Sequence, residues 1–243
     1  MPLFSKTITD FWQAPLLNGD IIYSDDVFTI ATNANLEEED RLMVLETTDG
    51  RIMAVMTPEM AEKAGLYHQE EMSESRFRQK LNQADITLHG ADYIFYFSEE
   101  EKSKLLQENA GSTLRQLTEK EDGDVFSEFQ SSASEQDLDN AYVELEHWAV
   151  FGSFEQNHLI SAASMYPWNN AQIADMGVLT LESFRGQGHA RKVVRAISQY
   201  AYAHGYEPQY RCQLDNLASL ALAKAAGLTL FGKWELVSPD STH

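Results

Sequence analysis

The segment Val178–Ala190 constrains the fold more than any other part of the chain, because a strand, a turn and a helix follow one another there without a linker. Residues 173–180, which lead into this segment and include its first three residues, are apolar enough to form a buried strand. After the turn, apolar residues recur at the spacing of an amphipathic helix, at Val193, Val194, Ile197 and Ala201. We therefore expect an α/β arrangement in which a strand delivers the chain directly to a helix N-terminus.

This junction has the physical features of an anion site. A helix N-terminus gathers unpaired backbone N–H groups and the positive end of the helix dipole, and together these bind phosphate. Gly186 and Gly188 would let the backbone approach a ligand closely. The alternative interpretation is a tight turn without any ligand. A dinucleotide fingerprint is excluded because a third glycine is missing, and a nucleotide P-loop is excluded because no lysine-serine/threonine pair follows.

The same turn resembles the pyrophosphate loop of the GNAT superfamily of N-acetyltransferases. That loop reads Gln/Arg-x-x-Gly-x-Gly/Ala, and here Arg185, Gly188 and Ala190 occupy the three fixed positions. In the family, the loop amides hold the pyrophosphate of coenzyme A. The strand before the loop splays from its neighbour and pairs its backbone with the pantetheine arm.

A second motif of the family follows in the right order. The family has a helix with Asn-x-x-Ser/Ala-x-x-Leu and then Gly-Phe; here Asn216, Ser219 and Leu222 are followed by Gly227-Leu228. Asn216 alone would be interpreted as a helix cap. The two motifs together extend the resemblance over residues 112–243. It implies a GNAT-type mixed, largely antiparallel central sheet flanked by helices.

The resemblance implies acetyl-coenzyme A as co-substrate and no metal. The residues expected to contact the cofactor come from the strand, the loop and the second motif; they are Val178, Leu179, Thr180, Arg185, Gly186, Gln187, Gly188, His189, Ala190, Asn216 and Ser219. A backbone N–H near Val178 would stabilise the oxyanion of the tetrahedral intermediate.

Acyl transfer to an amine also needs a base, because an alkylammonium has a pKa near 10. Asp175, on the strand that leads to the loop, is the candidate, with Glu144 and Glu146 as alternatives. The family commonly protonates the departing thiolate with a tyrosine, but the corresponding residue here is Ala223. A thiol of pKa about 8.5 leaves tolerably as its anion, and Ser219 would be a weak substitute.

The first 110 residues are not plainly covered by the resemblance. Strand-like runs at 21–23, 27–31, 41–46 and 52–56, with a turn at Asp49-Gly50, predict a small sheet with a hairpin. Helices are expected from Thr57 to Gly65 and over 73–84. We expect an auxiliary N-terminal α/β domain at 1–110 and a boundary at Gly111. Residues 61–66 faintly resemble 223–228, so this domain is either a degenerate acetyltransferase-like half or merely ends a helix with a similar glycine.

Composition narrows the partners. The formal charge of −20 disfavours nucleic acid and anionic membranes and attracts cations, including amines. The single cysteine, Cys212, allows no intramolecular disulfide and suggests a reducing compartment, and no signal peptide or membrane span is visible. We expect a cytoplasmic protein that binds a coenzyme A thioester and an amine acceptor, with a homodimer as one expected assembly.

Two functions follow from these patterns. The first is transfer of an acetyl group from acetyl-coenzyme A to a primary amine in a direct ternary complex. The second is a non-catalytic acyl-coenzyme A-binding sensor or scaffold, which Ala223 motivates. The loop Tyr166–Asn170 would either shape the acceptor site or form an ordinary exposed turn.

Overall fold

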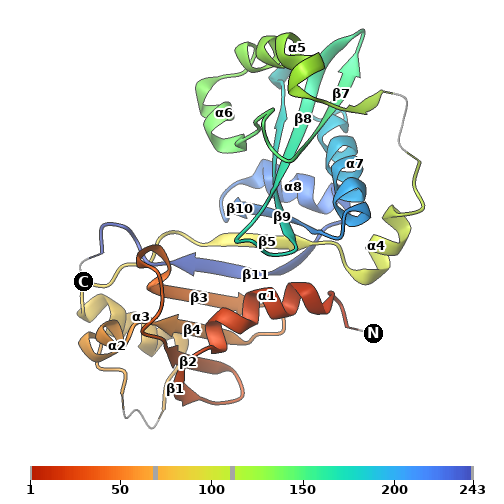
Figure 1. The fold of residues 1–243 in the computed structure, drawn as a ribbon. Helices are drawn as coiled ribbons and strands as arrows, with labels where there is room; N and C mark the ends of the chain where they lie inside the picture. Colours follow the sequence, from red (N-terminus) through yellow and green to blue (C-terminus); the bar gives the residue numbers. More distant parts are fainter. Residues whose placement is uncertain (1, 68–70, 110–112, 242–243) are drawn as a thin grey trace. The chain divides into compact units, whose positions relative to one another are not determined.

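The computed structural model describes residues 2–67, 71–109 and 113–241 (Figure 1). The chain divides into two compact units, and each unit is made of segments that are distant in sequence. One unit comprises residues 1–7, 95–211 and 217–229; the other comprises residues 8–94, 212–216 and 230–243. The boundary expected at Gly111 lies outside the described residues, and the division into domains at 1–110 and 112–243 remains a prediction.

The unit that contains residues 8–94 is built on a sheet with strand order β1-β2-β4-β3-β11. Its strands are β1 (Asp20–Ser24), β2 (Phe28–Thr32), β3 (Leu42–Thr47), β4 (Ile52–Met56) and β11 (Thr229–Leu236). Strands β3 and β4 form the antiparallel hairpin expected around Asp49-Gly50, and β2 pairs with β4 in parallel. Strand β11 pairs antiparallel with β3, so the last strand of the chain extends a sheet made of early residues.

Helices α1 (Lys6–Leu17), α2 (Pro58–Lys63) and α3 (Glu74–Gln83) accompany these strands, with a short 3-10 turn, η1, at Glu38–Asp40. The start of α2 follows from its sequence, because Thr57 Oγ1 accepts a hydrogen bond from Met60 N and Pro58 occupies the first helical position. The core of this unit gathers Phe28, Leu42, Phe77 and their neighbours from strands and helices.

The other unit carries the strand order β10-β9-β8-β7-β6. Its strands are β6 (Leu114–Gln116), β7 (Ala149–Glu155), β8 (His158–Pro167), β9 (Ile173–Thr180) and β10 (Glu207–Gln213); β5 (Asp92–Tyr96) lies where the chain passes between the units. Strands β6 to β9 pair antiparallel in succession, while β9 and β10 are parallel. The fold class expected from the sequence, a mixed and mostly antiparallel sheet flanked by helices, is confirmed.

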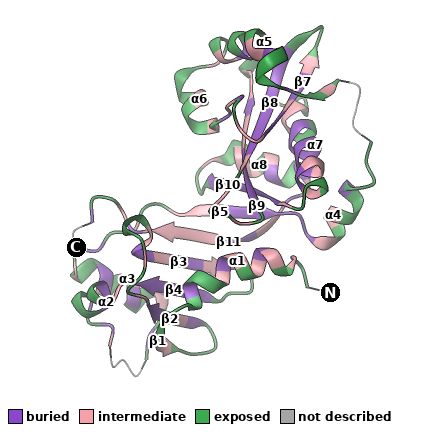
Figure 2. Cartoon of the chain, in the orientation of Figure 1, coloured by how far each residue is buried: buried purple, intermediate pink, exposed green. Residues whose placement is uncertain are grey.

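Among the residues that the structure describes, five helices belong to this second unit: α4 (Glu99–Leu105), α5 (Glu119–Ser131), α6 (Glu135–Ala141), α7 (His189–Ala203) and α8 (Leu217–Ala226), with a 3-10 turn, η2, at Glu182–Phe184. Ser98 Oγ and Ser134 Oγ cap α4 and α6 by accepting hydrogen bonds from Glu101 N and Asp137 N. Figure 2 shows that much of β7 and β8 is buried, while α5 and α6 expose most of their surface.

Helix α7 and the pair α5–α6 pack on opposite faces of the sheet. Ser153 faces α7, since its Oγ lies 3.2 Å from Nδ1 of His189. The adjacent Gly152 faces the other way, where a Cβ would meet Leu117 and Leu159 of the core that α5 completes. Successive strand residues point to opposite faces, so the two faces offer separate surfaces to a ligand.

Three elements differ from the expectation. Helix α1 was not predicted, because its sequence contains Pro15 and has no acidic residue in its first turn; the packing of Trp12 against Phe231 and Trp234 accounts for it. The sequence is acidic and helix-favouring from about residue 134 to 146, but helix α6 ends at Ala141, since Tyr142 adopts the left-handed conformation (φ 46°). The apolar pattern predicts a strand from Tyr210, whereas β10 begins at Glu207.

Candidate active site

The central feature of the site is a wedge where β9 parts from β10. The two strands pair from Glu207 opposite Ile173 to Tyr210 opposite Met176. Among the described residues, their ladder ends there, although β9 continues to Thr180 in register with β8. The strands expected to splay before the loop therefore do so.

The backbone of β9 alternates in direction along this open edge. Leu181 N donates to Ile160 O of β8, 3.0 Å away. In an antiparallel pair, alternate residues direct both their N–H and C=O to the partner strand. Val178 and Thr180 therefore direct these groups away from β8, into the wedge. Leu179 points its side chain into the core beneath α5, where it is 4% exposed, so only its backbone is near the wedge.

The turn after β9 leads into α7 through two glycines in the left-handed region. Gly186 has φ 75° and Gly188 has φ 85°, and no atom lies within 4 Å of a Cβ placed on either residue. Glycine is needed here for its backbone conformation, and the space above the loop is open. Gly188 is the N-cap of α7, and no side chain caps the helix.

The charges around this helix start favour an anion. Helices α2, α4, α5 and α6 carry acidic residues in their first turns, whereas α7 carries none and begins His-Ala-Arg-Lys. Arg185 donates from Nη2 to Asp137 Oδ1 at 2.8 Å and from Nε to Thr180 O at 3.2 Å. Gln187 Nε2 donates to Ser183 O. An anion would find helix amides, the dipole and a nearby guanidinium together.

The residues of the second motif lie at the start of α8. Asn216 immediately precedes the helix, and its backbone N–H donates to Gln213 O at 3.1 Å. Ser219 lies in the first turn and is half-buried. Ala223 is fully buried. A hydroxyl group on a longer side chain at position 223 would therefore have to displace core atoms.

Asp175 is held in a dense hydrogen-bond network on the α5–α6 side of the sheet. Its Oδ1 accepts from Gln209 Nε2 (2.8 Å) and Arg211 Nε (3.1 Å), and its Oδ2 accepts from Arg211 Nη2 (2.7 Å) and Tyr166 Oη (3.3 Å). A carboxylate offers about four lone-pair positions, and all four are occupied here. Proton uptake by Asp175 would therefore break its ion pair with Arg211.

The loop between β8 and β9 completes this network. The Arg211 guanidinium lies 4.4 Å from the ring centre of Trp168, so the loop's tryptophan covers the Asp175–Arg211 pair. Burial, followed by the charge of Asp175, raises the pKa of Tyr166 to about 12. Glu144, one alternative base, donates its backbone N–H to Ser164 Oγ (3.2 Å), and the other, Glu146, is exposed.

The sequence analysis did not single out Gln209, Arg211, Tyr142 or His147. Gln209 and Arg211 are two residues apart and therefore share one face of β10. Their spacing points to Asp175 only once the register between β9 and β10 is known. Tyr142 and His147 lie in the segment between α6 and β7, where no periodic pattern marks them. Their proximity to Tyr166 comes from the fold.

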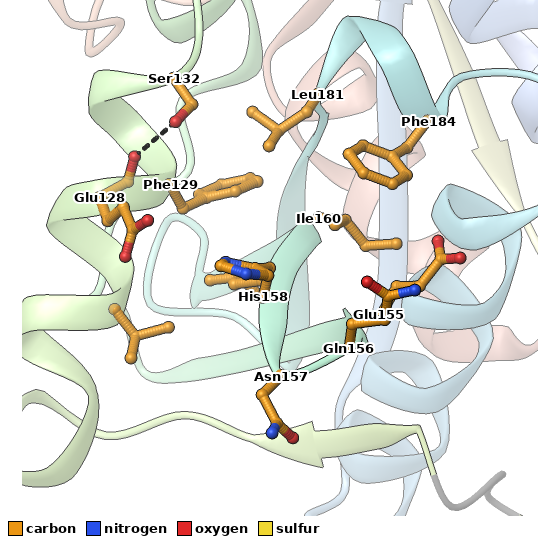
Figure 3. A pocket seen from close by; sticks show the side chains of 12 residues that line it. Glu128, Phe129, Ser132, Glu155, Gln156, Asn157, His158, Ile160, Leu181 and Phe184 are labelled. Atoms are coloured by element: carbon orange, nitrogen blue, oxygen red, sulfur yellow. Dashed lines mark hydrogen bonds between the residues drawn. The ribbon is translucent and has the colours of Figure 1, made fainter.

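A cavity of about 350 Å³ opens on the same side of the sheet, away from the wedge. Figure 3 shows Phe129, Leu181 and Phe184 gathered at one side, with polar side chains of the β7–β8 turn opposite. Its rim includes Glu128 and Glu155. Neither Val178 nor the loop residues 185–190 line it. The cavity is therefore a separate feature, and the candidate site is the wedge with the adjoining loop.

Two further observations limit the chemistry. Within the described residues, no group of three or more His, Cys, Asp or Glu side chains is placed to hold a metal ion. Cys212 is buried, and burial raises the pKa of its thiol to about 11, so it is a poor nucleophile. Over the same part of the chain, no helix is long and apolar enough to cross a membrane.

Comparison with known proteins identifies the region around the wedge. Residues 115–228 match the family model described as the acetyltransferase (GNAT) family. No curated protein matches the sequence significantly.

Solved structures share the fold at low sequence identity. A GNAT-family acetyltransferase from Colwellia psychrerythraea is 19% identical, with a TM-score of 0.51, over 78% of this chain and 78% of that one. A GCN5-related N-acetyltransferase from Sphaerobacter thermophilus is 11% identical, with a TM-score of 0.46, over 68% and 56% of the two chains. The Colwellia match extends beyond residues 115–228, so part of the N-terminal region shares the fold of that structure as well. Residues 115–228, which contain the wedge and the loop, therefore match the GNAT acetyltransferase family.

Proposed function

We propose that the protein transfers an acetyl group from acetyl-coenzyme A to a primary amine in a direct ternary complex. The observation that supports this most strongly is the combination of the wedge with an uncapped helix start. Strand backbone at Val178 and Thr180 that faces away from β8 leads within a few residues to the open loop of Gly186 and Gly188. An extended amide-bearing arm that ends in a pyrophosphate has the same succession of groups.

In this arrangement, backbone N–H and C=O groups of β9 pair with the pantetheine arm as a neighbouring strand would. The amides of residues 186–190 and the dipole of α7 hold the pyrophosphate. Arg185 adds positive charge by exchanging its exposed ion pair with Asp137 for a phosphate oxygen. Asn216 and Ser219 contact the cofactor from the start of α8, as the resemblance to the family implies.

The thioester carbonyl then lies near Val178, where the strands separate. A backbone N–H that points into the wedge would donate to the developing oxyanion. We propose that Asp175 organises the acceptor side through Arg211 and Tyr166, because its four hydrogen bonds leave no lone pair for the amine proton.

The leaving group has to depart without a tyrosine at position 223. General acid catalysis typically contributes about 10²–10⁴-fold, so its loss would slow the reaction. A thiol of pKa about 8.5 is a fair leaving group as its anion. We propose that the thiolate leaves the tetrahedral adduct unassisted and then takes a proton from the nitrogen of the newly formed, still protonated amide.

A second candidate function rests on the same wedge and uncapped helix start. Ala223 is fully buried, so the usual acid position is absent from the wedge, and a domain without it could bind acyl-coenzyme A as a sensor or scaffold. The acceptor-side network argues for catalysis. A domain that only bound the cofactor would not need a paired Asp175–Arg211 group at the open apex.

Calorimetric titration with acetyl-coenzyme A tests the proposal first. Gly188→Trp places a bulky side chain in the open space above the loop and forces an indole-bearing residue into φ 85°. Gly123→Trp, in α5, is the matched control, since no atom lies within 4 Å of its Cβ position either. Binding by the wild type and the control but not by Gly188→Trp supports the cofactor site. Absence of binding by the wild type refutes it.

Turnover distinguishes the two functions. Purified protein is incubated with acetyl-coenzyme A and each of propylamine, cadaverine and lysine amide, and thiol release is followed with a chromogenic disulfide. Amine-dependent thiol release supports the enzyme. Tight binding of acetyl-coenzyme A with no release above hydrolysis supports the sensor or scaffold.

A further inference from the structure

Three rings from three different segments meet on the α5–α6 side of the wedge. Tyr142 is the left-handed residue that ends α6, His147 precedes β7, and Tyr166 lies near the end of β8. Their ring centres are 5.0 Å (Tyr142–His147), 5.8 Å (Tyr142–Tyr166) and 4.9 Å (His147–Tyr166) apart. His147 and Tyr166 are half-buried and Tyr142 is exposed, so the group borders solvent.

The group lies at the apex of the wedge. Ser164 of β8 is directly opposite Gly177 of β9, one residue beyond the last pair between β9 and β10. His147 Nδ1 is 2.8 Å from Ser164 Oγ. The end of α6 packs against β9 at the same point, because a Cβ on Gly177 would meet the backbone oxygens of Ala141 and Tyr142. An imidazole is thus fixed where the thioester carbonyl of the proposed function would lie.

The hydrogen bonds of Ser164 indicate which imidazole nitrogen carries the proton. Ser164 Oγ accepts from Glu144 N (3.2 Å) and is the donor to Tyr142 O (3.5 Å). A hydroxyl has one donor and two acceptor positions. All of these contacts form together only when His147 Nδ1 donates to Ser164 Oγ. In that tautomer, Nε2 carries a free lone pair.

The surroundings favour the neutral form of this imidazole. Burial lowers the pKa of His147, and the charges of Glu144 and Glu146 on its own segment oppose that effect without cancelling it. From β8, Tyr166 presents a phenol whose raised pKa keeps it uncharged, and Tyr142 presents another ring. Asp175 of β9, the next carboxylate, is paired with Arg211 of β10. A neutral imidazole can accept a proton, whereas an imidazolium cannot.

We propose that His147 is the general base of the acetyl transfer, with Nε2 accepting the amine proton and Ser164 acting as a positioning residue through Nδ1. This inference rests on the proposed function. The rings of Tyr142 and Tyr166 could offer cation–π contacts to the ammonium group of an incoming primary amine.

The proton and bond changes balance as follows. The ammonium R–NH₃⁺ gives one proton to Nε2 and becomes R–NH₂. Its lone pair forms the N–C bond to the thioester carbonyl carbon, and the C–S bond breaks as the thiolate of coenzyme A leaves. The thiolate takes the second proton from nitrogen to give the thiol, and the imidazolium then releases its proton to water. One acetyl-coenzyme A and one ammonium give one amide, one thiol and one H⁺.

The kinetic test compares His147→Gln with wild type between pH 5 and 9, with the amine that wild type turns over fastest among the three above. His89→Gln is the matched control, because His89 is exposed in a loop of the other unit. We expect kcat of His147→Gln to fall by about 10²–10⁴-fold and its acid limb to disappear, while the Kd for acetyl-coenzyme A and the KM for the amine stay close to wild type. Added imidazole should partly rescue His147→Ala. A His147→Gln enzyme with wild-type kcat and an unchanged acid limb would overturn the inference.

A measurement on the wild-type protein removes any dependence on folding of the variants. Long-range ¹H–¹⁵N NMR of the histidine rings reports the tautomer and pKa of His147 without turnover, assigned by its loss in His147→Gln. The inference requires the Nδ1–H form and a pKa below the ordinary value. An Nε2–H form overturns it even if the enzyme is active. If acetyl-coenzyme A binds but no amine reacts, the proposed function fails on its own account, whatever the tautomer.

Discussion

At Gly177, strand β9 packs against the end of α6 and also borders the wedge. A single added methyl group at this position should therefore disturb the packing of α6. A Cβ on Gly177 would lie 2.0 Å from Ala141 O and 2.7 Å from Tyr142 O. Both atoms belong to backbone, so no side-chain rotation relieves the contact. The end of α6 has to move away from β9 if Gly177 is replaced by alanine.

The cost follows from overpacking. Extra methyl groups in well-packed regions typically cost about 1–3 kcal/mol. In a domain of this size, each kcal/mol lowers Tm by roughly 2–4 °C, so Gly177→Ala should lower Tm by about 2–12 °C. Because Tyr142 shifts with α6, the ring group around His147 should open as well. We expect kcat to fall more than the affinity for acetyl-coenzyme A.

Differential scanning calorimetry of Gly177→Ala and Gly123→Ala tests this reasoning. Gly123 lies in α5, and its Cβ position is open. Alanine is more favourable than glycine in a helix by roughly 0.5–1 kcal/mol, so the control should melt at the same temperature as wild type or slightly higher. The reasoning about α6 is refuted if Gly177→Ala melts within 1 °C of wild type and keeps its activity.

Other perturbations probe the loop, the network and the imidazole. Asp137→Asn frees Arg185 from an exposed ion pair worth about 0.2–1 kcal/mol. Because binding no longer has to break this pair, calorimetry should show the Kd for acetyl-coenzyme A falling by about 1.4- to 5-fold. A higher Kd would contradict this. Arg211→Met leaves the Asp175 carboxylate buried without its cation, which should lower the free energy of unfolding by about 3 kcal/mol. Urea denaturation should show that the double variant Asp175→Asn/Arg211→Met recovers part of this loss. A double variant no more stable than Arg211→Met would count against the pairing. The pKa of His147 is lower in the folded than in the unfolded protein, so its contribution to stability is present above the unfolded pKa of about 6.5 and is lost as pH falls through the folded value. Denaturation at pH 7.5 and 5 should therefore show a smaller loss for His147→Gln than for wild type, and equal losses would refute the assigned shift.

The elements predicted best from sequence are those that a local pattern specifies. Thr57 and the Ser98-x-x-Glu101 spacing mark helix starts in the sequence, and both side chains cap their helices, because an N-cap side chain bonds to an amide only three residues away. The wedge loop is equally local, since its glycines adopt the positive φ that their positions require. The role of these residues in binding coenzyme A remains a prediction.

The acceptor side of the site could not be predicted in the same way, because strand register and tertiary contact assemble it. Asp175 was singled out as a base from its place before the loop. Its bonds to Gln209 and Arg211 exist only because β10 pairs with β9 in one particular register. A shift of one residue would point both partners to the opposite face of the sheet.

The same network explains how a strongly acidic protein could deprotonate an amine. A net charge of −20 attracts ammonium ions from a distance, but a free carboxylate at the reaction centre would stabilise the protonated, unreactive form. At the apex, the nearest buried carboxylate, Asp175, is already neutralised by Arg211, and the imidazole of His147 is uncharged. Under the proposed function, the long-range field would bring the cation to the wedge, and the local environment would favour loss of its proton. Restoring a free carboxylate by Arg211→Met should accordingly raise affinity for the ammonium and lower kcat.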